Sequence, residues 1–427
     1  MGNELQRADQ GVKGVLKSLF MSDTERANSI NRRITEYNPC SVDAFFEPSR
    51  GVYNAIISGG DARLRTNAMV AQAVCAVHNN FPVIVLHEGN RQLEAQLRNN
   101  FSSIGKYCEV SDRTPCFEPF YKLNELEIAT QILEIAPKEY DIKFNARYYI
   151  EGISSLLKKS GKHLSFKMFS TCPHALLFDK VDELQTQGKI FDSEAQEMKS
   201  KLMMGQSEAY KLDTLLATLK MEIEPMMYIR KQGYKPCNII SELETNKVLC
   251  FDIASVTNQL LINTIVYQLK LALTRGFSYT IIIDSISTNV NEKYAAYMKS
   301  SSDRVCKTIA SDDFFAMVGS DEKTFSATIG ESQILVVMGH ASGHSATKWA
   351  DVFGQYDKYE QSYSTSRGAS KQTPFSIFSS PNYNRSVNID KRRDYIVKPE
   401  NISHMRNGEA YILTMARGEV AHLILIE

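Results

Sequence analysis

One short segment has the spacing of a phosphate-binding loop between an apolar run and a helical stretch. It reads Gly59-Gly60-Asp61-Ala62-Arg63-Leu64-Arg65-Thr66. In the usual pattern, G-x-x-x-x-G-K-S/T, backbone groups surround the phosphates, the lysine reaches the terminal phosphates and the hydroxyl holds magnesium. Gly59 and Thr66 keep this spacing, whereas Leu64 replaces the inner glycine and Arg65 replaces the lysine. The candidate nucleotide-binding residues are Gly59, Gly60, Asp61, Arg63, Leu64, Arg65 and Thr66.

Two interpretations of this loop stay open. Leu64 cannot take a positive φ without strain, so the segment can be a plain strand-to-helix turn that binds no ligand. Arg65 can instead contact a phosphate, because a guanidinium is a good phosphate partner, although its planar fork differs from the point charge of a lysine.

A second candidate site follows the apolar run that ends at Asp284. In nucleotide hydrolases a carboxylate at this place holds magnesium or its water shell. Thr66 and Asp284 are therefore the candidate magnesium residues, on condition that a nucleotide binds. Such enzymes commonly place a water-activating Glu next, but this chain has Ser285, and a serine hydroxyl is a poor base at neutral pH. Alternatively, Asp284 only ends a strand.

The elements that would position these residues are short apolar strands alternating with helices. The segment Tyr53–Leu86 has a strand-loop-helix-strand pattern, which predicts a parallel sheet buried on both faces. Further strands are expected at Lys247–Asp252, Tyr279–Ile283, Gln333–Met338, Glu409–Met415 and Glu419–Ile426. The fold class is therefore α/β with a mainly parallel sheet.

A helical texture fills the middle of the chain. Asn124 and Glu127 form a capping-box pattern that opens a helix, and Pro137 stops it. We expect an inserted all-α domain over residues 121–235, within an α/β domain made of residues 1–120 and 236–427. The polar segment 361–392 predicts a surface loop.

Composition restricts the class of protein. The 427 residues include 49 basic and 49 acidic side chains, which argues against a chain-wide basic surface for nucleic acid but not against a local basic groove. Eight cysteines lie scattered without a Cys-x-x-Cys pair, which favours a reduced compartment and makes a disulfide framework improbable. No apolar segment has the length of a membrane span, and the first residues do not resemble a secretory signal. We expect a cytoplasmic protein.

The order of these pieces resembles one family, the TraG/TraD-like coupling-protein ATPases of conjugation and type IV secretion. This family belongs to the HerA/FtsK class of RecA-fold motors. The likeness extends over residues 45–427 and is carried, beside the loop and Asp284, by Val83–Asn90, Phe117–Phe120, Lys348–Gln361 and Lys391–Ile402.

The resemblance implies a RecA-like P-loop NTPase fold with an all-α insertion, ATP and magnesium as cofactors, and DNA or secretion-machinery proteins as partners. It also implies a homo- or hetero-oligomeric ring in which Arg392 or Arg393 reaches across a subunit boundary as an arginine finger. A solvated turn is the alternative for this basic cluster.

Leu64, Arg65 and Ser285 depart together from the family's hydrolytic apparatus. The sequence therefore predicts a pseudo-ATPase that acts as a binding, scaffold or regulatory component. Two alternatives remain. The chain is an active DNA-translocating ATPase with a non-standard loop, or it is a partner of an active homologue in mixed rings.

Overall fold

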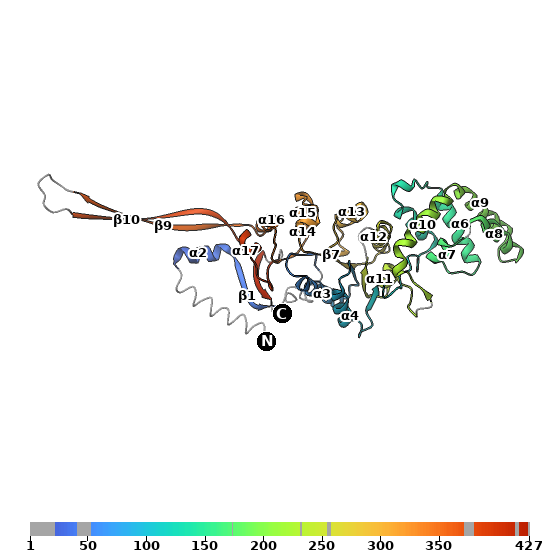
Figure 1. The fold of residues 1–427 in the computed structure, drawn as a ribbon, viewed down its shortest axis with the longest axis horizontal. Coiled ribbons are helices and arrows are strands. Elements are labelled where there is room, and N and C mark those ends of the chain that lie inside the picture. The colour runs from blue at the N-terminus through green and yellow to red at the C-terminus, as the bar shows by residue number, and fades with distance from the viewer. Residues whose placement is uncertain are drawn as a thin grey trace. The chain divides into compact units, whose positions relative to one another are not determined.

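The structure is a computed structural model that describes residues 22–40, 53–172, 174–230, 233–253, 258–370, 380–414 and 418–425. The chain divides into two compact units, whose elements are labelled in Figure 1. The central unit contains residues 41–335. The terminal unit combines residues 1–40 with residues 336–427, and the strand β8 (Ile334–Val337) lies at the division between the two in the sequence.

The central unit contains a parallel sheet in the order β2-β7-β6-β3-β5-β4, and each neighbouring pair in it is parallel. Most positions of these strands are buried, which explains why they are continuous apolar runs in the sequence. The strands are β2 (Ala55–Ser58), β3 (Val83–His87), β4 (Tyr107–Val110), β5 (Val248–Asp252), β6 (Tyr279–Asp284) and β7 (Val305–Ser311). The prediction of an α/β fold with a mainly parallel sheet is confirmed.

Helices connect the strands of the central sheet. Every parallel connection requires a crossover, and helices supply it here. They are α3 (Ala62–His78), α4 (Arg91–Phe101), α11 (Ile239–Glu244), α12 (Gln259–Thr274), α13 (Glu292–Met298), α14 (Phe314–Met317) and α15 (Glu322–Gly330). The two longest, α3 and α12, each bury much of their length, so they pack as core helices and not as amphipathic surface helices.

A helical region leaves the sheet after β4 and returns before α11. Its first helix, α5 (Glu125–Ile135), has the predicted capping box of Asn124 and Glu127. The helices that follow are α6 (Ala146–Lys159), α7 (Phe166–Ser170), α8 (Leu177–Thr186), α9 (Asp192–Gly205) and α10 (Ala209–Ile223). At the entry and exit, Phe117 pairs with both Met227 and Cys237 in isolated bridges, so the two connecting segments lie side by side. The limits of the insertion, residues 121–235, stay a prediction.

The terminal unit begins with α2 (Asp23–Arg32) and β1 (Ile34–Cys40). Later parts of the chain add α16 (Gly343–Phe353), β9 (Gln355–Ser370), β10 (Ser380–Tyr395), α17 (Pro399–Ser403), β11 (Glu409–Thr414) and β12 (Glu419–Leu425). Strands that are distant in the sequence pair in this unit, because β1 pairs in parallel with β12, which also pairs antiparallel with β11.

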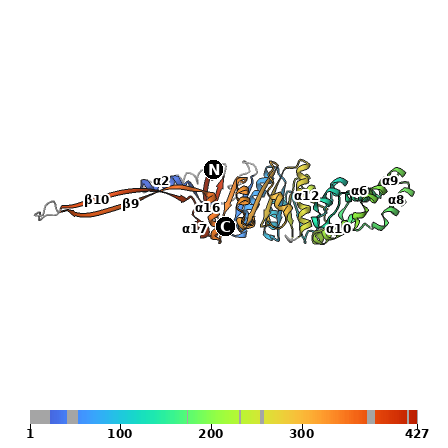
Figure 2. The ribbon, with the colours of Figure 1, turned by 90° about the horizontal axis from the view of Figure 1, so that it is seen from above.

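The predicted surface loop over residues 361–392 is wrong for the residues that the structure describes. Residues 361–370 and 380–392 belong to β9 and β10, which form a long antiparallel ribbon (Figures 1 and 2). The sequence did not predict this ribbon, because strands outside a buried sheet need no apolar pattern and backbone pairing alone can hold them together. Asn28 of α2 fixes its base, since the Asn28 side chain donates to the Tyr359 carbonyl and accepts from the Tyr359 amide.

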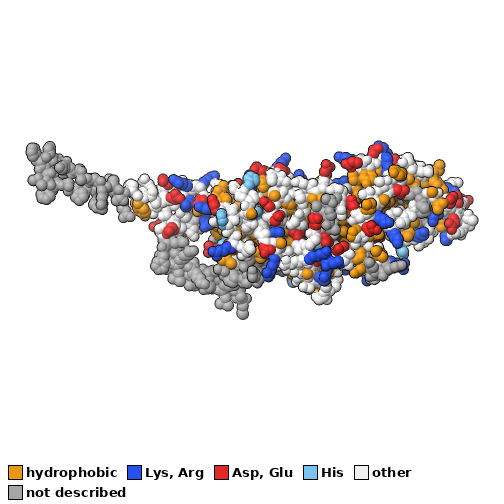
Figure 3. Space-filling model, in the orientation of Figure 1, with side chains coloured by type: hydrophobic (Ala, Val, Ile, Leu, Met, Phe, Trp, Pro, Cys, Tyr) orange, Lys and Arg blue, Asp and Glu red, His pale blue; other side chains and the backbone are white. Residues whose placement is uncertain are grey.

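The surface carries both signs of charge. Figure 3 shows Lys and Arg side chains interspersed with Asp and Glu over the visible face, in keeping with the equal totals of the sequence. A membrane-crossing helix would need more length and apolarity than any helix in the described part of the chain has.

Candidate functional site

The candidate residues of the central unit meet at the carboxyl ends of its parallel strands, where ligands bind in open α/β sheets. Gly59 follows β2, and Asp284 ends β6. The amide of Gly59 donates to the carbonyl of Ser311 at the end of β7, over 2.9 Å, so the strand between β2 and β6 sets where the loop begins. The sheet order thus places the loop and the carboxylate two strands apart at one edge.

The loop itself is short, because α3 begins already at Ala62. Gly59 and Gly60 have φ angles of 86° and 68°, which only glycine adopts readily. Asp61 is the N-cap of α3, and its carboxylate accepts the amide of Arg63 over 2.8 Å. The amides at a helix N-terminus attract anions. Here the chain's own carboxylate already occupies that position.

Arg65 lies inside the first turns of α3 and folds back onto the loop. Its Nη1 donates to the carbonyls of Gly59, over 3.1 Å, and Gly60, over 2.6 Å. The side chain is 9% exposed, and its buried Nε has no hydrogen-bond partner among the described residues. Leu64 is also helical, so the positive-φ part of the loop is limited to the two glycines. In this arrangement the arginine holds the turn from the inside.

Thr66 and Asp284 are brought together by a residue that sequence analysis missed. The side-chain amide of Asn90 donates to Asp284 Oδ2 over 2.6 Å and to Thr66 Oγ1 over 3.3 Å. Its Oδ1 accepts the amide of Leu93, because Asn90 is also the N-cap of α4. The only signal in the sequence was its place just after the Gly turn that follows β3. Asn90 therefore links the two candidate magnesium residues in a fixed geometry.

Ser285 has a φ of 60°, which is uncommon for a residue other than glycine and costs backbone energy. Its hydroxyl donates to Asp284 Oδ1 over 3.0 Å, and its amide donates to the carbonyl of Ala310 over 2.8 Å. Ser285 and Asn90 therefore each donate a hydrogen bond to a different oxygen of the Asp284 carboxylate. Ser285 thus holds the carboxylate and, as an uncharged hydroxyl, is a poor base for activating water.

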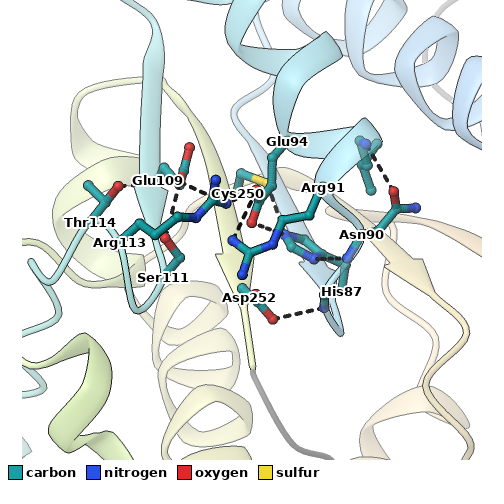
Figure 4. A network of polar contacts seen from close by, with 12 residues as sticks. His87, Asn90, Arg91, Glu94, Glu109, Ser111, Arg113, Thr114, Cys250 and Asp252 are labelled. Atoms are coloured by element: carbon teal, nitrogen blue, oxygen red, sulfur yellow. Dashed lines mark hydrogen bonds and ion pairs between the residues drawn. The ribbon is translucent and has the colours of Figure 1, made fainter.

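A buried polar network continues from Asn90 along the strand ends (Figure 4). His87, at the end of β3, accepts the amide of Asn90 on Nδ1 over 3.2 Å. Its Nε2 lies 3.3 Å from Cys250 Sγ and 3.8 Å from Glu94 Oε1. Burial lowers the pKa of His87, against the opposing effect of Asp252 and Glu94, so the ring is neutral at pH 7.

Two buried carboxylates complete this network, and arginines at its rim pair with them. Glu94 is 1% exposed and contacts Arg113, while Glu109 contacts Arg98. Burial alone would raise the pKa of Glu109, but the hydrogen bonds from Arg98 and Tyr107 outweigh it and lower the pKa. The network therefore fixes the ends of β3, β4 and β5 by charge-assisted hydrogen bonds.

The candidate arginine finger lies in the terminal unit, on β10. Arg392 is 69% exposed, and its Nη1 lies 3.6 Å from Glu360 Oε2 on β9. Next to it, Lys391 pairs with Asp357 over 2.7 Å, and Arg393 lies opposite Asp357 in the strand register. These cations belong to a strand and not to the solvated turn that was the alternative. The role of Arg392 and Arg393 as a finger stays a prediction.

The candidate residues fit the magnesium ion of Mg-ATP but not its phosphates. Thr66 and Asp284 offer the hydroxyl and carboxylate oxygens that magnesium prefers. The phosphate side does not fit in this conformation, because the Asp61 carboxylate stands at the helix N-terminus and Arg65 binds the loop carbonyls.

No protein-family model matches the chain, and no curated protein matches it either. Among solved structures, it is similar to the unbound monoclinic form of the bacterial conjugative coupling protein TrwBdeltaN70. The TM-score is 0.50 at 14% identity, covering 97% of this chain and 91% of that chain. This chain has the fold of a conjugative coupling protein. The RecA-like α/β fold expected from the sequence resemblance is confirmed.

Two further likenesses are weaker. The plasmid coupling protein TrwB in complex with the GTP analogue GDPNP has a TM-score of 0.48 at 13% identity, covering 93% of this chain and 92% of that chain. VirB4 of Thermoanaerobacter pseudethanolicus has a TM-score of 0.43 at 11% identity, covering 88% of this chain and 89% of that chain.

Proposed function

We propose that this chain is a coupling-protein-type component of a conjugative-transfer or type IV secretion machine that hydrolyses ATP inefficiently and acts by binding, as a scaffold or regulatory subunit. The observation that carries the proposal is the inward position of Arg65, which donates to the carbonyls of Gly59 and Gly60. The coupling-protein fold supports the class of machine.

Phosphoryl transfer depends on positioning and on charge stabilisation. Three parts of that apparatus are altered together. The cation of the loop is engaged with the loop's own backbone, the helix N-terminus is capped by the Asp61 carboxylate, and Ser285 stands where a water-activating acid would be. Each change removes a different contribution to phosphoryl transfer.

Steady-state ATP turnover by the full chain, with and without single-stranded DNA, tests the proposal. Kinases, which also transfer phosphoryl groups, turn over at roughly 1–100 per second, and we expect this chain to stay at least about a hundredfold below that range. Asp284→Ala should leave this low rate unchanged. Turnover at ordinary motor rates, lost in Asp284→Ala, would contradict the proposal.

The second candidate is an active DNA-translocating ATPase. The observation that favours it is the meeting of Thr66 and Asp284 at Asn90, since a magnesium ion needs these two oxygens close together. Calorimetric titration with Mg-ATP distinguishes this candidate. Saturable binding that requires magnesium and is weakened by Thr66→Ala would favour it, whereas no heat at millimolar nucleotide would end it.

Partners follow from the proposed class. DNA, proteins of the secretion machine and further copies of such subunits in a ring are the proposed partners, with Arg392 and Arg393 as candidates for the subunit boundary. Native mass spectrometry, alone and with an active homologue, measures whether homo-oligomers or mixed rings form. Strictly monomeric behaviour in both experiments would reject the ring.

A further inference from the structure

Three cysteines that lie far apart in the sequence meet at the base of the helical insertion. Cys108 lies on β4, Cys116 lies on the segment that enters the insertion, and Cys237 lies on the segment that returns from it. Their sulfur atoms all lie within 4.8 Å of one another, and Cys116 Sγ is 3.2 Å from Cys237 Sγ. We call Cys108, Cys116 and Cys237 the thiol cluster.

Backbone contacts hold the thiol cluster in place. The amide of Cys237 donates to the carbonyl of Cys116, and the amide of Glu118 donates to the carbonyl of Cys237, each over 2.9 Å. Cys108 approaches from β4, which is the last strand of the sheet order. Three separate backbone segments therefore present one sulfur each to the same point, as the ligands of a structural metal site do.

The surroundings suit a thiolate site with an entry path. Cys116 and Cys237 are buried, whereas Cys108 is partly exposed and gives access from solvent. Lys247 places a positive charge near Cys108 and Cys237, and its Nζ binds Glu242 Oε2 over 2.9 Å. A nearby positive charge stabilises thiolates, which are the form that binds metals.

Packing alone is a weaker account of this cluster. Buried cysteines commonly act as small apolar side chains, and Cys75 and Cys250 can be explained in that way. Packing does not require three sulfurs to converge. At a Zn–S distance of roughly 2.3 Å, tetrahedral ligands place their sulfurs roughly 3.8 Å apart. The observed spacing needs only small side-chain adjustments to reach that geometry.

We propose that Cys108, Cys116 and Cys237 bind one thiophilic metal ion, Zn²⁺ or Cu⁺, that fastens the neck of the helical insertion to the edge strand of the sheet. Soft thiolate ligands select these ions. Binding converts the three thiols to thiolates and releases their protons to solvent. Zn²⁺ takes water as a fourth ligand from the Cys108 side, whereas Cu⁺ is satisfied by three sulfurs.

The first test is the metal content of the full chain, purified under a thiol reductant without chelator and measured by inductively coupled plasma mass spectrometry. We expect close to one Zn²⁺ or Cu⁺ per chain, and the element found distinguishes the two. Cys108→Ser should lower bound metal by about tenfold or more. Cys306→Ser is the matched control, because Cys306 is also partly exposed on a strand, and it should keep the metal.

A spectroscopic measurement keeps the test independent of how well a variant folds. Wild-type protein freed of metal and titrated with Co²⁺ should gain a thiolate-to-cobalt charge-transfer band that saturates at one equivalent, and added Zn²⁺ should abolish it. The same titration of Cys108→Ser should give a weaker band, while Cys306→Ser matches wild type.

Two results would overturn the proposal. One is a chain isolated without metal that gives no charge-transfer band with Co²⁺. The other is a disulfide between Cys116 and Cys237 in protein isolated without oxidant, found by mass spectrometry as a cross-linked peptide pair that separates on reduction.

Discussion

The two halves of the candidate site differ in where their polar side chains find hydrogen-bond partners. In the loop between β2 and α3, the Arg65 cation and the Asp61 carboxylate both bind backbone groups of their own segment. At the ends of β3 and β6, side chains from separate elements bind one another, with Asn90 joining Thr66 to Asp284. The loop half is closed by local contacts, whereas the strand half is assembled by the tertiary fold.

This difference indicates which half a ligand could enter. A phosphate in the loop would have to displace both charged side chains and reopen the first turn of α3. A cation between Thr66 and Asp284 would replace only the hydrogen bonds of one neutral amide. The fold thus retains a possible metal position while the adjoining phosphate position is filled by the chain itself.

The largest stability effect is expected in the strand half, from Glu94→Ala. The Glu94 carboxylate is 1% exposed and pairs with Arg113, whose side chain is 47% exposed, so Glu94→Ala leaves a gap in the packing and a rim cation without its partner. We expect a loss of about 2–3 kcal/mol in the free energy of unfolding, measured by urea denaturation. Exposed Glu88→Ala should change it by less than about 0.5 kcal/mol. Equal effects of the two substitutions would show that the network does not hold the strand ends.

Asn90→Ala should come next. It removes both the link between Thr66 and Asp284 and the N-cap of α4, for a loss of about 1–2 kcal/mol in the same assay. Asn90→Asp keeps the cap but places a second carboxylate against Asp284. If Asn90 bridges Thr66 and Asp284, Asn90→Asp should also lower the free energy of unfolding. An unchanged free energy of unfolding would argue against the bridge.

A smaller effect is expected from Asp61 in the loop half. Asp61→Ala removes the N-cap of α3 and should cost about 1 kcal/mol. Asp61→Asn keeps the cap and removes the negative charge, so stability should change by only a few tenths of a kcal/mol. If the carboxylate blocks the anion position, Asp61→Asn should gain a thermal shift with inorganic phosphate that wild type lacks. Identical shifts in the two proteins would refute the block.

The pH dependence of stability should reveal the buried histidine. Burial lowers the pKa of His87 below 6.5 in the folded protein, so the unfolded chain binds a proton that the folded chain does not. Stability is therefore complete above pH 6.5 and is lost as the pH falls below that value. His87→Gln should flatten the fall of the thermal midpoint between pH 7 and pH 5, and exposed His78→Gln should not. A profile unchanged by His87→Gln would place the titration elsewhere.

The fold could be predicted because its evidence is local in the sequence. Buried parallel strands such as β3 and β6 are uninterrupted apolar runs, and the capping box of Asn124 and Glu127 marks a helix start directly. The ribbon of β9 and β10 could not be predicted, because its strands lack the apolar pattern of a buried sheet.

Contacts between segments that are distant in the sequence could not be predicted either. Asn90 has an ordinary N-cap identity, and its link to Asp284 crosses 194 residues. The thiol cluster looked scattered for the same reason, since Cys116 and Cys237 are separated by 121 residues. By contrast, the unusual composition of the Gly59–Thr66 loop was visible directly, but the direction in which Arg65 points depends on where α3 begins.

The central claim is that the closed loop half limits ATP hydrolysis. The most direct test compares steady-state turnover by wild type with that of the triple variant Leu64→Gly, Arg65→Lys, Ser285→Glu, which restores the three altered positions. We expect background turnover in wild type and a rise of at least about a hundredfold in the variant, since removing one stabilising group from an active site typically costs about 10²–10³. Wild-type turnover at motor rates, with no gain in the triple variant, would contradict the account.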